Sequence, residues 1–241
     1  MSKIAFLGLG VMGFPMAGHL STKFEVTVYN RTVSKAEKWM SQYTGNLAMT
    51  PAEAAKNADF VFSCVGNDDD LRSILLGIDG AIDSMKKGTV FTDHTTCSAK
   101  VTKQMVAYSQ KKGIGFVDAP VSGGQAGAEN GQLTIMCGGA QEHYDRIKPV
   151  ISQYAKFSSL IGPSGSGQLT KMVNQICIAG LLQALSEGLK FSEKANLDGK
   201  KVLDVISKGA AGSWQMENRG MTMLEDKFNF GFAVDWMKKD L

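Results

Sequence analysis

An α/β fold with a doubly wound, mostly parallel sheet, followed by an all-helical region, is the fold class that this sequence predicts. Short apolar segments typical of buried strands alternate with amphipathic helical segments through the first two-thirds of the chain. After a Gly- and Ser-rich breaker at residues 162–167, only helical patterns follow. We therefore expect two domains, residues 1–162 and residues 163–241.

Composition excludes several function classes. Charged residues make up 20% of the 241 residues and the net charge is +3, which does not indicate a nucleic-acid-binding protein. The apolar runs are too short to span a bilayer, and the N-terminus lacks a signal-peptide pattern, so we expect a cytoplasmic protein with no membrane partner. No metal site is expected, because no Cys-x-x-Cys pair or zinc-like His spacing accompanies the four cysteines, Cys64, Cys97, Cys137 and Cys177.

The first expected strand, Ile4–Leu7, leads into a G-x-G-x-x-G turn and a helix. In a dinucleotide-binding unit the first glycine permits the tight turn, the second lets backbone approach the pyrophosphate, and the third lets the helix pack on the sheet. The pyrophosphate then lies on amides at the helix N-terminus. A plain strand–helix turn is the alternative. We expect the cofactor to contact Gly8, Leu9, Gly10, Val11, Met12 and Gly13.

The end of the second expected strand, Val26–Tyr29, indicates which dinucleotide binds. An NAD site usually has Asp or Glu here to accept from the ribose hydroxyl. This chain has Asn30, Arg31 and Thr32 instead, a neutral amide, a guanidinium and a hydroxyl that suit a 2′-phosphate. We therefore expect NADP rather than NAD. The alternative is that Arg31 is simply solvated and Thr32 caps the next helix.

The remaining elements of the first domain follow in alternation. Expected strands are Phe60–Val65, Thr89–Thr92, Gly115–Val117 and Leu133–Cys137, and expected helices include Ser98–Lys112 and Gln141–Tyr154. Val65 ends a strand at its carboxyl end, where open sheets bind ligands, and we expect it to contact the cofactor. The acidic triplet Asp68 to Asp70 is interpreted as a helix N-terminus stabilised by the dipole, not a metal cluster.

The second domain begins with a long helix, expected from about Gln168 to Ala195. Its apolar residues occupy more than one face, so we expect burial between domains or between subunits. A homo-oligomer, dimeric or tetrameric, is the corresponding expectation.

Three motifs stand in order along the chain: Gly8-Leu-Gly-Val-Met-Gly-Phe-Pro-Met-Ala17, Asp118-Ala-Pro-Val-Ser-Gly-Gly124 and Gly165-Ser-Gly-Gln-Leu-Thr-Lys171-Met-Val-Asn174. Together they resemble the β-hydroxyacid dehydrogenase family, which includes 3-hydroxyisobutyrate dehydrogenase, tartronate semialdehyde reductase and glyoxylate/succinic semialdehyde reductase. The resemblance implies a Rossmann domain joined to an all-helical domain by a long helix. Family members usually continue well past the Lys-Asp pair near Leu241, so we expect the helical domain to be incomplete.

The second motif is expected to bind substrate. It follows a strand and leaves Ser122, Gly123 and Gly124 with accessible amides and one hydroxyl, a suitable site for a small carboxylate. The resemblance implies the same role for these residues. A generic Gly-rich turn is the alternative.

The third motif carries the expected acid/base. Lys171 and Asn174 are three residues apart and share a helix face. Burial lowers the pKa of a lysine, which can then exchange a proton with a substrate hydroxyl as hydride leaves. The resemblance implies that Lys171 is the catalytic lysine and that Asn174 binds substrate. A lysine extending along an interface helix is the alternative.

Two further residues are assigned by resemblance. Thr96 matches a Ser/Thr near the nicotinamide, and Lys239 matches a lysine that reaches the cofactor from the helical domain. Thr96 is also expected as an N-cap for the helix near Ser98. The family does not require His94, which we do not expect to be catalytic.

The resemblance implies an NADP-dependent oxidoreductase that transfers a hydride between nicotinamide and a small 3-hydroxyacid or semialdehyde, of the 3-hydroxyisobutyrate, succinic semialdehyde or glyoxylate type. Nicotinamide carries the hydride and Lys171 the proton. The alternative is a catalytically silent NADP-binding interaction module. Imine reductases share the scaffold but generally lack the lysine, so Lys171 disfavours that activity.

Overall fold

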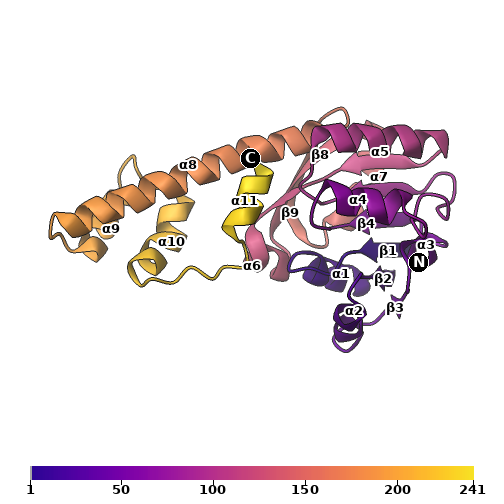
Figure 1. Ribbon diagram of the computed structural model, residues 1–241, viewed down its shortest axis with the longest axis horizontal. Coiled ribbons are helices and arrows are strands. Elements are labelled where there is room, and N and C mark those ends of the chain that lie inside the picture. The colour runs from indigo at the N-terminus through magenta and orange to yellow at the C-terminus, as the bar shows by residue number, and fades with distance from the viewer. Residues whose placement is uncertain (1) are drawn as a thin grey trace. The chain divides into compact units, whose positions relative to one another are not determined.

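The computed structural model describes residues 2–241 (Figure 1). By its internal contacts the chain divides into two compact units, Met1–Lys171 and Met172–Leu241. Every strand of the described chain belongs to the first unit, and the second is built from helices. The predicted fold class is therefore confirmed. The division falls inside helix α8 (Ser166–Lys194), whereas the sequence placed a boundary at residue 162, where the last strand ends.

In the described chain, nine strands form one sheet in the order β3-β2-β1-β4-β5-β6-β8-β7, with β9 paired to β8. β1 pairs in parallel with both β2 and β4, and β4, β5 and β6 continue in parallel. β8 runs antiparallel to β6 and β7. The strand bounds are β1 Lys3–Leu7, β2 Glu25–Tyr29, β3 Asn46–Leu47, β4 Phe60–Ser63, β5 Val90–Asp93, β6 Gly115–Asp118, β7 Val121–Ser122, β8 Leu133–Gly139 and β9 Ala155–Gly162.

Helices cover both faces of the sheet because side chains alternate along each strand. In β1, Ile4 and Phe6 join one apolar core, and Ala5 and Leu7 join the other. The first core also contains residues of α1, α2 and α7, and the second contains residues of α3, α4 and α5. The bounds in this unit are α1 Gly13–Ser21, α2 Val33–Met40, α3 Pro51–Ala55, α4 Asp68–Leu76, α5 Ala99–Lys111, α6 Gly124–Glu129 and α7 Gln141–Ile151.

The carboxyl ends of the parallel strands line up in one row across the sheet. The register pairs Leu7 with Tyr29 and with Ser63, then Ser63 with Asp93, and Asp93 with Asp118. Strand order reverses at β1 and β4, and open α/β sheets bind ligands outside this edge at such a reversal. The loops that follow these strand ends hold most of the residues predicted to bind cofactor and substrate.

The second unit contains most of α8, then α9 (Gly199–Ile206), α10 (Trp214–Leu224) and α11 (Val234–Asp240). Asp198 and Ser213 accept hydrogen bonds from the first amides of α9 and α10, which fixes where these helices begin. The unit has a small apolar core of its own, formed by Leu185, Leu189, Leu203 and Met216.

Candidate active site

The turn between β1 and α1 contains three glycines with different surroundings. Gly8 has a φ of +102°, and a Cβ there would collide with the carbonyl of Cys64 at the end of β4. A Cβ on Gly13 would collide with the carbonyl of Gly8. On Gly10, in contrast, a Cβ would meet no atom of the described chain within 4 Å. The fold therefore requires glycine at Gly8 and Gly13, but not at Gly10.

Helix α1 begins with an open end. Among the described residues no side chain caps its first amides: Met12 stands at the N-cap without such a bond, and the first turn contains no acidic residue. The side chains of Thr50, Asn67 and Ser98 cap α3, α4 and α5, whereas α2, α6, α7 and α11 begin, like α1, without a side-chain cap. Uncapped amides at the positive end of a helix dipole suit an anion such as a pyrophosphate.

Asn30 holds the glycine turn in place. Its Oδ1 accepts a hydrogen bond of 2.8 Å from Leu9 N, and its Nδ2 donates one of 2.9 Å to Thr32 O. The side chain thus links the loop after β2 to the loop after β1. Thr32 occupies the N-cap position of α2, but its hydroxyl makes no capping bond there. Asn30 therefore fixes the turn's shape, a role that the sequence did not indicate.

Arg31 lies at the same strand end and is largely exposed. Its side chain is 82% exposed, and its Nη1 is 2.8 Å from Oδ1 of Asp70 in the first turn of α4. The guanidinium therefore has a carboxylate partner in α4, the helix that follows β4 on the other side of β1. The sequence did not suggest this pair.

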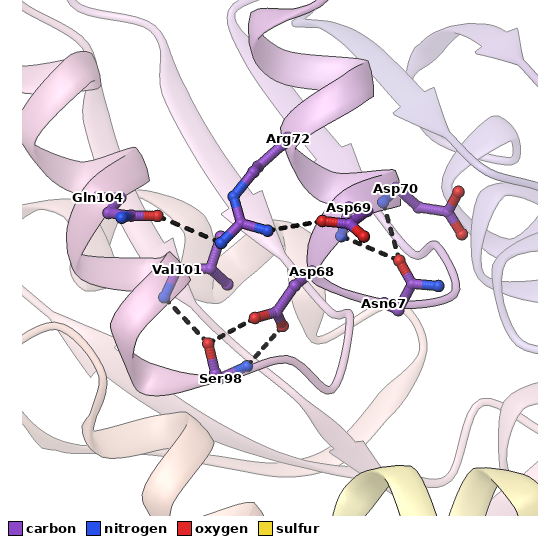
Figure 2. A network of polar contacts seen from close by, with 8 residues as sticks. All are labelled: Asn67, Asp68, Asp69, Asp70, Arg72, Ser98, Val101 and Gln104. Atoms are coloured by element: carbon purple, nitrogen blue, oxygen red, sulfur yellow. Dashed lines mark hydrogen bonds and ion pairs between the residues drawn. The ribbon is translucent and has the colours of Figure 1, made fainter.

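Figure 2 shows how α4 is anchored at its start. Asn67 Oδ1 accepts from the amides of Asp69 and Asp70, both at 2.9 Å, so the prediction of a helix N-terminus at the acidic triplet is confirmed. Asp68 accepts from the amide and hydroxyl of Ser98, at 2.8 and 2.6 Å, which joins the starts of α4 and α5. Asp69 pairs with Arg72 at 2.7 Å.

The start of α5 corrects one expectation. Ser98, not Thr96, is the N-cap: its Oγ accepts from Val101 N at 3.1 Å. Two residues earlier, the half-buried Thr96 lies in the loop after β5. That loop is tied to the loop after β4 by a bond of 3.0 Å from Val65 N to Thr95 Oγ1. Capping therefore does not explain a threonine at position 96.

Two ionisable residues are fully buried at the end of β5. Asp93 accepts from Ser63 Oγ at 2.7 Å and from Thr95 N at 3.0 Å, and burial raises the pKa of Asp93 to about 6. His94 has Nδ1 2.6 Å from Ala119 O and Nε2 2.8 Å from the Tyr154 hydroxyl, and burial lowers its pKa to about 4. With both ring nitrogens engaged and only 2% exposure, His94 is a structural residue.

The start of α8 is held by a buried carboxylate and a buried amide. Asp118 accepts from Gly165 N at 2.7 Å and from Gln168 N at 3.0 Å. Gln168 is fully buried; its Nε2 donates to Thr95 O at 2.7 Å, and its Oε1 accepts from Cys97 N at 3.1 Å. Lys171 follows one turn later and is 7% exposed.

The predicted substrate loop follows β6. Ser122 ends β7, which pairs with β8, and Gly123 and Gly124 follow with φ values of +134° and +62°. Both values lie where side chains other than glycine are strained. A Cβ on Gly124 would meet nothing within 4 Å among the described residues, so this backbone is open to an approaching molecule.

The other two predicted residues belong to the second unit. Asn174 donates to Gln175 Oε1 at 2.8 Å, and Gln175 donates to Asp240 Oδ2, also at 2.8 Å. Lys239 pairs with Asp240 Oδ1 at 2.7 Å. Asn174 and Lys239 are therefore connected through Gln175 and Asp240, which join α8 to α11.

Within residues 2–241, no group of three or more His, Cys, Asp or Glu side chains is arranged to hold a metal ion. None of the helices in this range combines the length and the apolar character needed to cross a bilayer.

Comparison with known protein families shows to which family this chain belongs. Residues 3–176 match the family described as the NAD binding domain of 6-phosphogluconate dehydrogenase. Residues 165–241 match the NAD-binding family of NADP-dependent 3-hydroxyisobutyrate dehydrogenase. The chain belongs to the β-hydroxyacid dehydrogenase family.

Individual β-hydroxyacid dehydrogenases match along the whole chain. An uncharacterized oxidoreductase of Shewanella frigidimarina is 61% identical over 100% of this chain and 83% of its own length. The 2-hydroxy-3-oxopropionate reductase of Escherichia coli is 32% identical over 99% and 82%. A structure of Mycobacterium tuberculosis 3-hydroxyisobutyrate dehydrogenase with L-serine superposes with a TM-score of 0.90 at 27% identity, covering 100% of this chain and 84% of that one.

As a β-hydroxyacid dehydrogenase, the protein is an NAD(P)-dependent enzyme that acts on CH–OH groups. The structure fits a nicotinamide dinucleotide: the space next to Gly10 and the uncapped start of α1 suit its pyrophosphate. The residues of the first motif would hold that group.

Proposed function

We propose that this protein is an NADP-dependent dehydrogenase that interconverts a short 3-hydroxyacid and its 3-oxo acid. The observation that carries the proposal is the position of Lys171. This lysine is buried and lies one helical turn after a residue that binds both Thr95 and Asp118, at the sheet edge that carries the glycine turn. A buried amine at a dinucleotide-binding edge is suited to proton transfer.

The substrate class follows from what the relatives' ligands share. 3-Hydroxyisobutyrate, 2-hydroxy-3-oxopropionate and L-serine all have a carboxylate, one intervening carbon, and a terminal CH₂OH or CHO group. Apart from the oxidation state of the terminal carbon, they differ only in the small group on the intervening carbon. The hydroxyl of Ser122, the positive φ of Gly123 and the open backbone of Gly124 support a role in binding the shared carboxylate.

The chemistry divides between cofactor and protein. Nicotinamide accepts or returns the hydride at the carbon that bears the oxygen. In oxidation, Lys171 Nζ takes the hydroxyl proton as that carbon becomes an aldehyde; in reduction, it returns the proton to the carbonyl oxygen. The supporting roles that we propose are contact with the nicotinamide side for Val65 and Thr96, binding of substrate for Asn174, and contact with the cofactor for Lys239.

The charges around the end of β2 support NADP as the cofactor. Asn30 is neutral and occupied in holding Leu9, so position 30 has no carboxylate to accept from a ribose hydroxyl. Arg31 is exposed and its guanidinium suits a 2′-phosphate. These features favour NADP over NAD.

Turnover measurements test the proposal. Purified protein is mixed with NADPH or NADH and each of 2-methyl-3-oxopropionate, 2-hydroxy-3-oxopropionate, succinic semialdehyde and glyoxylate, and nicotinamide absorbance is followed. We expect oxidation of NADPH by at least one 3-oxo acid, faster than with NADH, and reduction of NADP⁺ by the matching 3-hydroxyacid. Binding of NADPH without oxidation across the panel would instead indicate a silent binding module.

A further inference from the structure

The backbone on both sides of Thr96 is held by one buried side chain. The carbonyl of Thr95 accepts from Gln168 Nε2 at 2.7 Å, and the amide of Cys97 donates to Gln168 Oε1 at 3.1 Å. A single carboxamide therefore fixes the peptide groups that precede and follow Thr96. Since rotation of either peptide group would move the Thr96 side chain, Gln168 sets the direction in which that side chain points.

Gln168 is itself held rigidly. It is fully buried, and its amide donates to Asp118 Oδ2 at 3.0 Å. Asp118 also accepts from Gly165 N at 2.7 Å, so the carboxylate fixes the first turn of α8 to the end of β6. Every polar atom of the Gln168 carboxamide thus has a partner in the loop after β5, and its backbone has a partner in the strand that leads to Ser122.

The same helix turn carries Lys171. Residues three apart on a helix lie on neighbouring positions of one face, so a shift of Gln168 along or around the helix axis moves Lys171 as well. Gln168 therefore connects Thr96 with Lys171. The proposed function assigns Thr96 to contact with the nicotinamide and Lys171 to proton exchange with the substrate oxygen. All of these residues lie within the first compact unit.

We propose that Gln168 is a positioning residue of the reaction: its carboxamide sets the geometry between the Thr96 loop and Lys171, so that nicotinamide and amine face the same substrate carbon. This inference rests on the proposed function. Misplacement of reacting groups by about 1 Å can cost about 100-fold in rate. A methionine, similar in length but without donor or acceptor, removes this control while filling the same space.

The first experiment compares native protein, Gln168→Met and Gln168→Lys in turnover, with NADPH affinity and the folded fraction measured in parallel. For Gln168→Met we expect a kcat lower by about 10- to 100-fold, with little change in NADPH affinity. For Gln168→Lys, which keeps a hydrogen-bond donor but no acceptor, we expect kcat to fall at least as far. A kcat for Gln168→Met within about 2-fold of native, by the same scale of effects, would overturn the inference.

The matched control is Tyr144→Phe. The Tyr144 hydroxyl is a buried link between α7 and β9, 2.9 Å from Ser158 O, and lies outside the proposed site. Its loss lowers the thermal midpoint of unfolding, as the loss of other buried hydrogen bonds does, and we expect kcat to stay at the native value. Equal loss of kcat in Tyr144→Phe and Gln168→Met would mean that general destabilisation, not positioning, is responsible.

A pH profile separates positioning from simple packing. In Gln168→Glu, a protonated carboxyl can still donate to Thr95 O and accept from Cys97 N, whereas the ionised form cannot donate. Burial and the Asp118 carboxylate, which accepts from the Gln168 backbone amide, favour protonation, and Lys171 on the next turn opposes it. We expect the kcat ratio of Gln168→Glu to native to rise as pH falls, and the ratio for Gln168→Met to stay flat. An equal rise of both ratios as pH falls would overturn the inference, because methionine has no proton to gain.

Two further readouts keep the outcomes distinct. The Cys97 amide is expected to exchange hydrogen for deuterium faster in Gln168→Met than in native protein, whatever the substrate. An unchanged exchange rate would show that Gln168 does not hold the peptide groups on either side of Thr96. Lys171→Ala is assayed alongside. Native-like turnover in that variant would remove Lys171 as the acid/base but would leave the exchange result valid. Absence of turnover from native protein on every substrate would overturn the proposed function, and with it the positioning role of Gln168.

Discussion

Arg31 in the loop after β2 and Asp70 in the first turn of α4 form an ion pair of 2.8 Å, and the strands that precede them, β2 and β4, lie on either side of β1. The guanidinium that we propose for the 2′-phosphate of NADP therefore faces a carboxylate of the same chain. That carboxylate both competes for Arg31 and repels a phosphate. The strength of NADP binding should depend on Asp70 as well as on Arg31.

Removing the charge of Asp70 should increase the preference for NADPH. Because exposed ion pairs contribute little, we expect Asp70→Asn to raise the ratio of NADPH to NADH affinity by about 2- to 5-fold. Arg31→Ala should lower the same ratio. Asp69→Asn is the matched control, since Asp69 lies on the same turn but pairs with Arg72. Titration of both cofactors tests this, and an equal response of the two Asp variants would contradict a specific role for Asp70.

Alanine at Gly10 and alanine at Gly13 should have opposite effects on stability and cofactor binding. Gly10→Ala should leave the free energy of unfolding near native, since its Cβ meets no atom of the described chain, but weaken NADPH binding about tenfold or more by occupying the pyrophosphate's approach. Gly13→Ala should destabilise the fold by about 1–3 kcal/mol, because its Cβ meets the Gly8 carbonyl. Thermal unfolding and cofactor titration of both variants check this. A destabilised Gly10→Ala protein would show that the turn has no free space beside Gly10.

Asp93 should make stability fall as pH rises through the acid range. Burial raises its folded pKa from 3.8 to about 6, so the folded state holds a proton that the unfolded state releases, and stability is lost between these values. His94 has the opposite sign: its folded pKa falls from 6.5 to about 4, so its contribution is lost as pH falls. The two effects largely oppose each other in the native protein.

Asp93→Asn isolates the first effect, since an amide oxygen can still accept from Ser63 and Thr95. The stability of this variant relative to native should increase from pH 4 to pH 7, by roughly 2–3 kcal/mol. Denaturant unfolding at several pH values measures this difference. A difference that is constant with pH would mean that Asp93 titrates normally.

Ser122 should act on substrate binding and not on hydride transfer. A hydrogen bond to a charged group contributes about 1.5–3 kcal/mol, so Ser122→Ala should raise KM for a 3-oxo acid about 10- to 100-fold with a smaller change in kcat. An aldehyde of the same length without the carboxylate provides the control, because its KM should not change. Equal increases for both substrates would argue against carboxylate recognition by this loop.

The sequence predicted those parts of the fold that depend on neighbouring residues. Periodic apolar segments located β1, β2, β4, β5, β6 and β8, and the spacing of Gly8, Gly10 and Gly13 identified the turn. β9 was missed because it is half-exposed: Phe157 is 61% and Ile161 is 51% exposed, which leaves no clean alternation.

Contacts between distant residues were beyond a local interpretation. Arg31 and Asp70 are 39 residues apart, and Gln168 contacts residues more than 70 positions away. In the sequence, Gln168 stands within the third motif and at the start of the expected long helix, and neither position indicates what its side chain contacts. No local pattern shows which backbone groups a buried carboxamide will contact. For the same reason, the sequence alone predicts Thr96 as the N-cap of α5, a position that Ser98 fills in the structure.

Single-turnover hydride transfer from NADPH in Lys171→Ala tests the central claim most directly. If Lys171 is the acid/base, the rate falls about 100- to 10,000-fold below that of the native protein. NADPH affinity stays nearly unchanged, because only proton transfer is removed. A hydride-transfer rate equal to that of the native protein would contradict it.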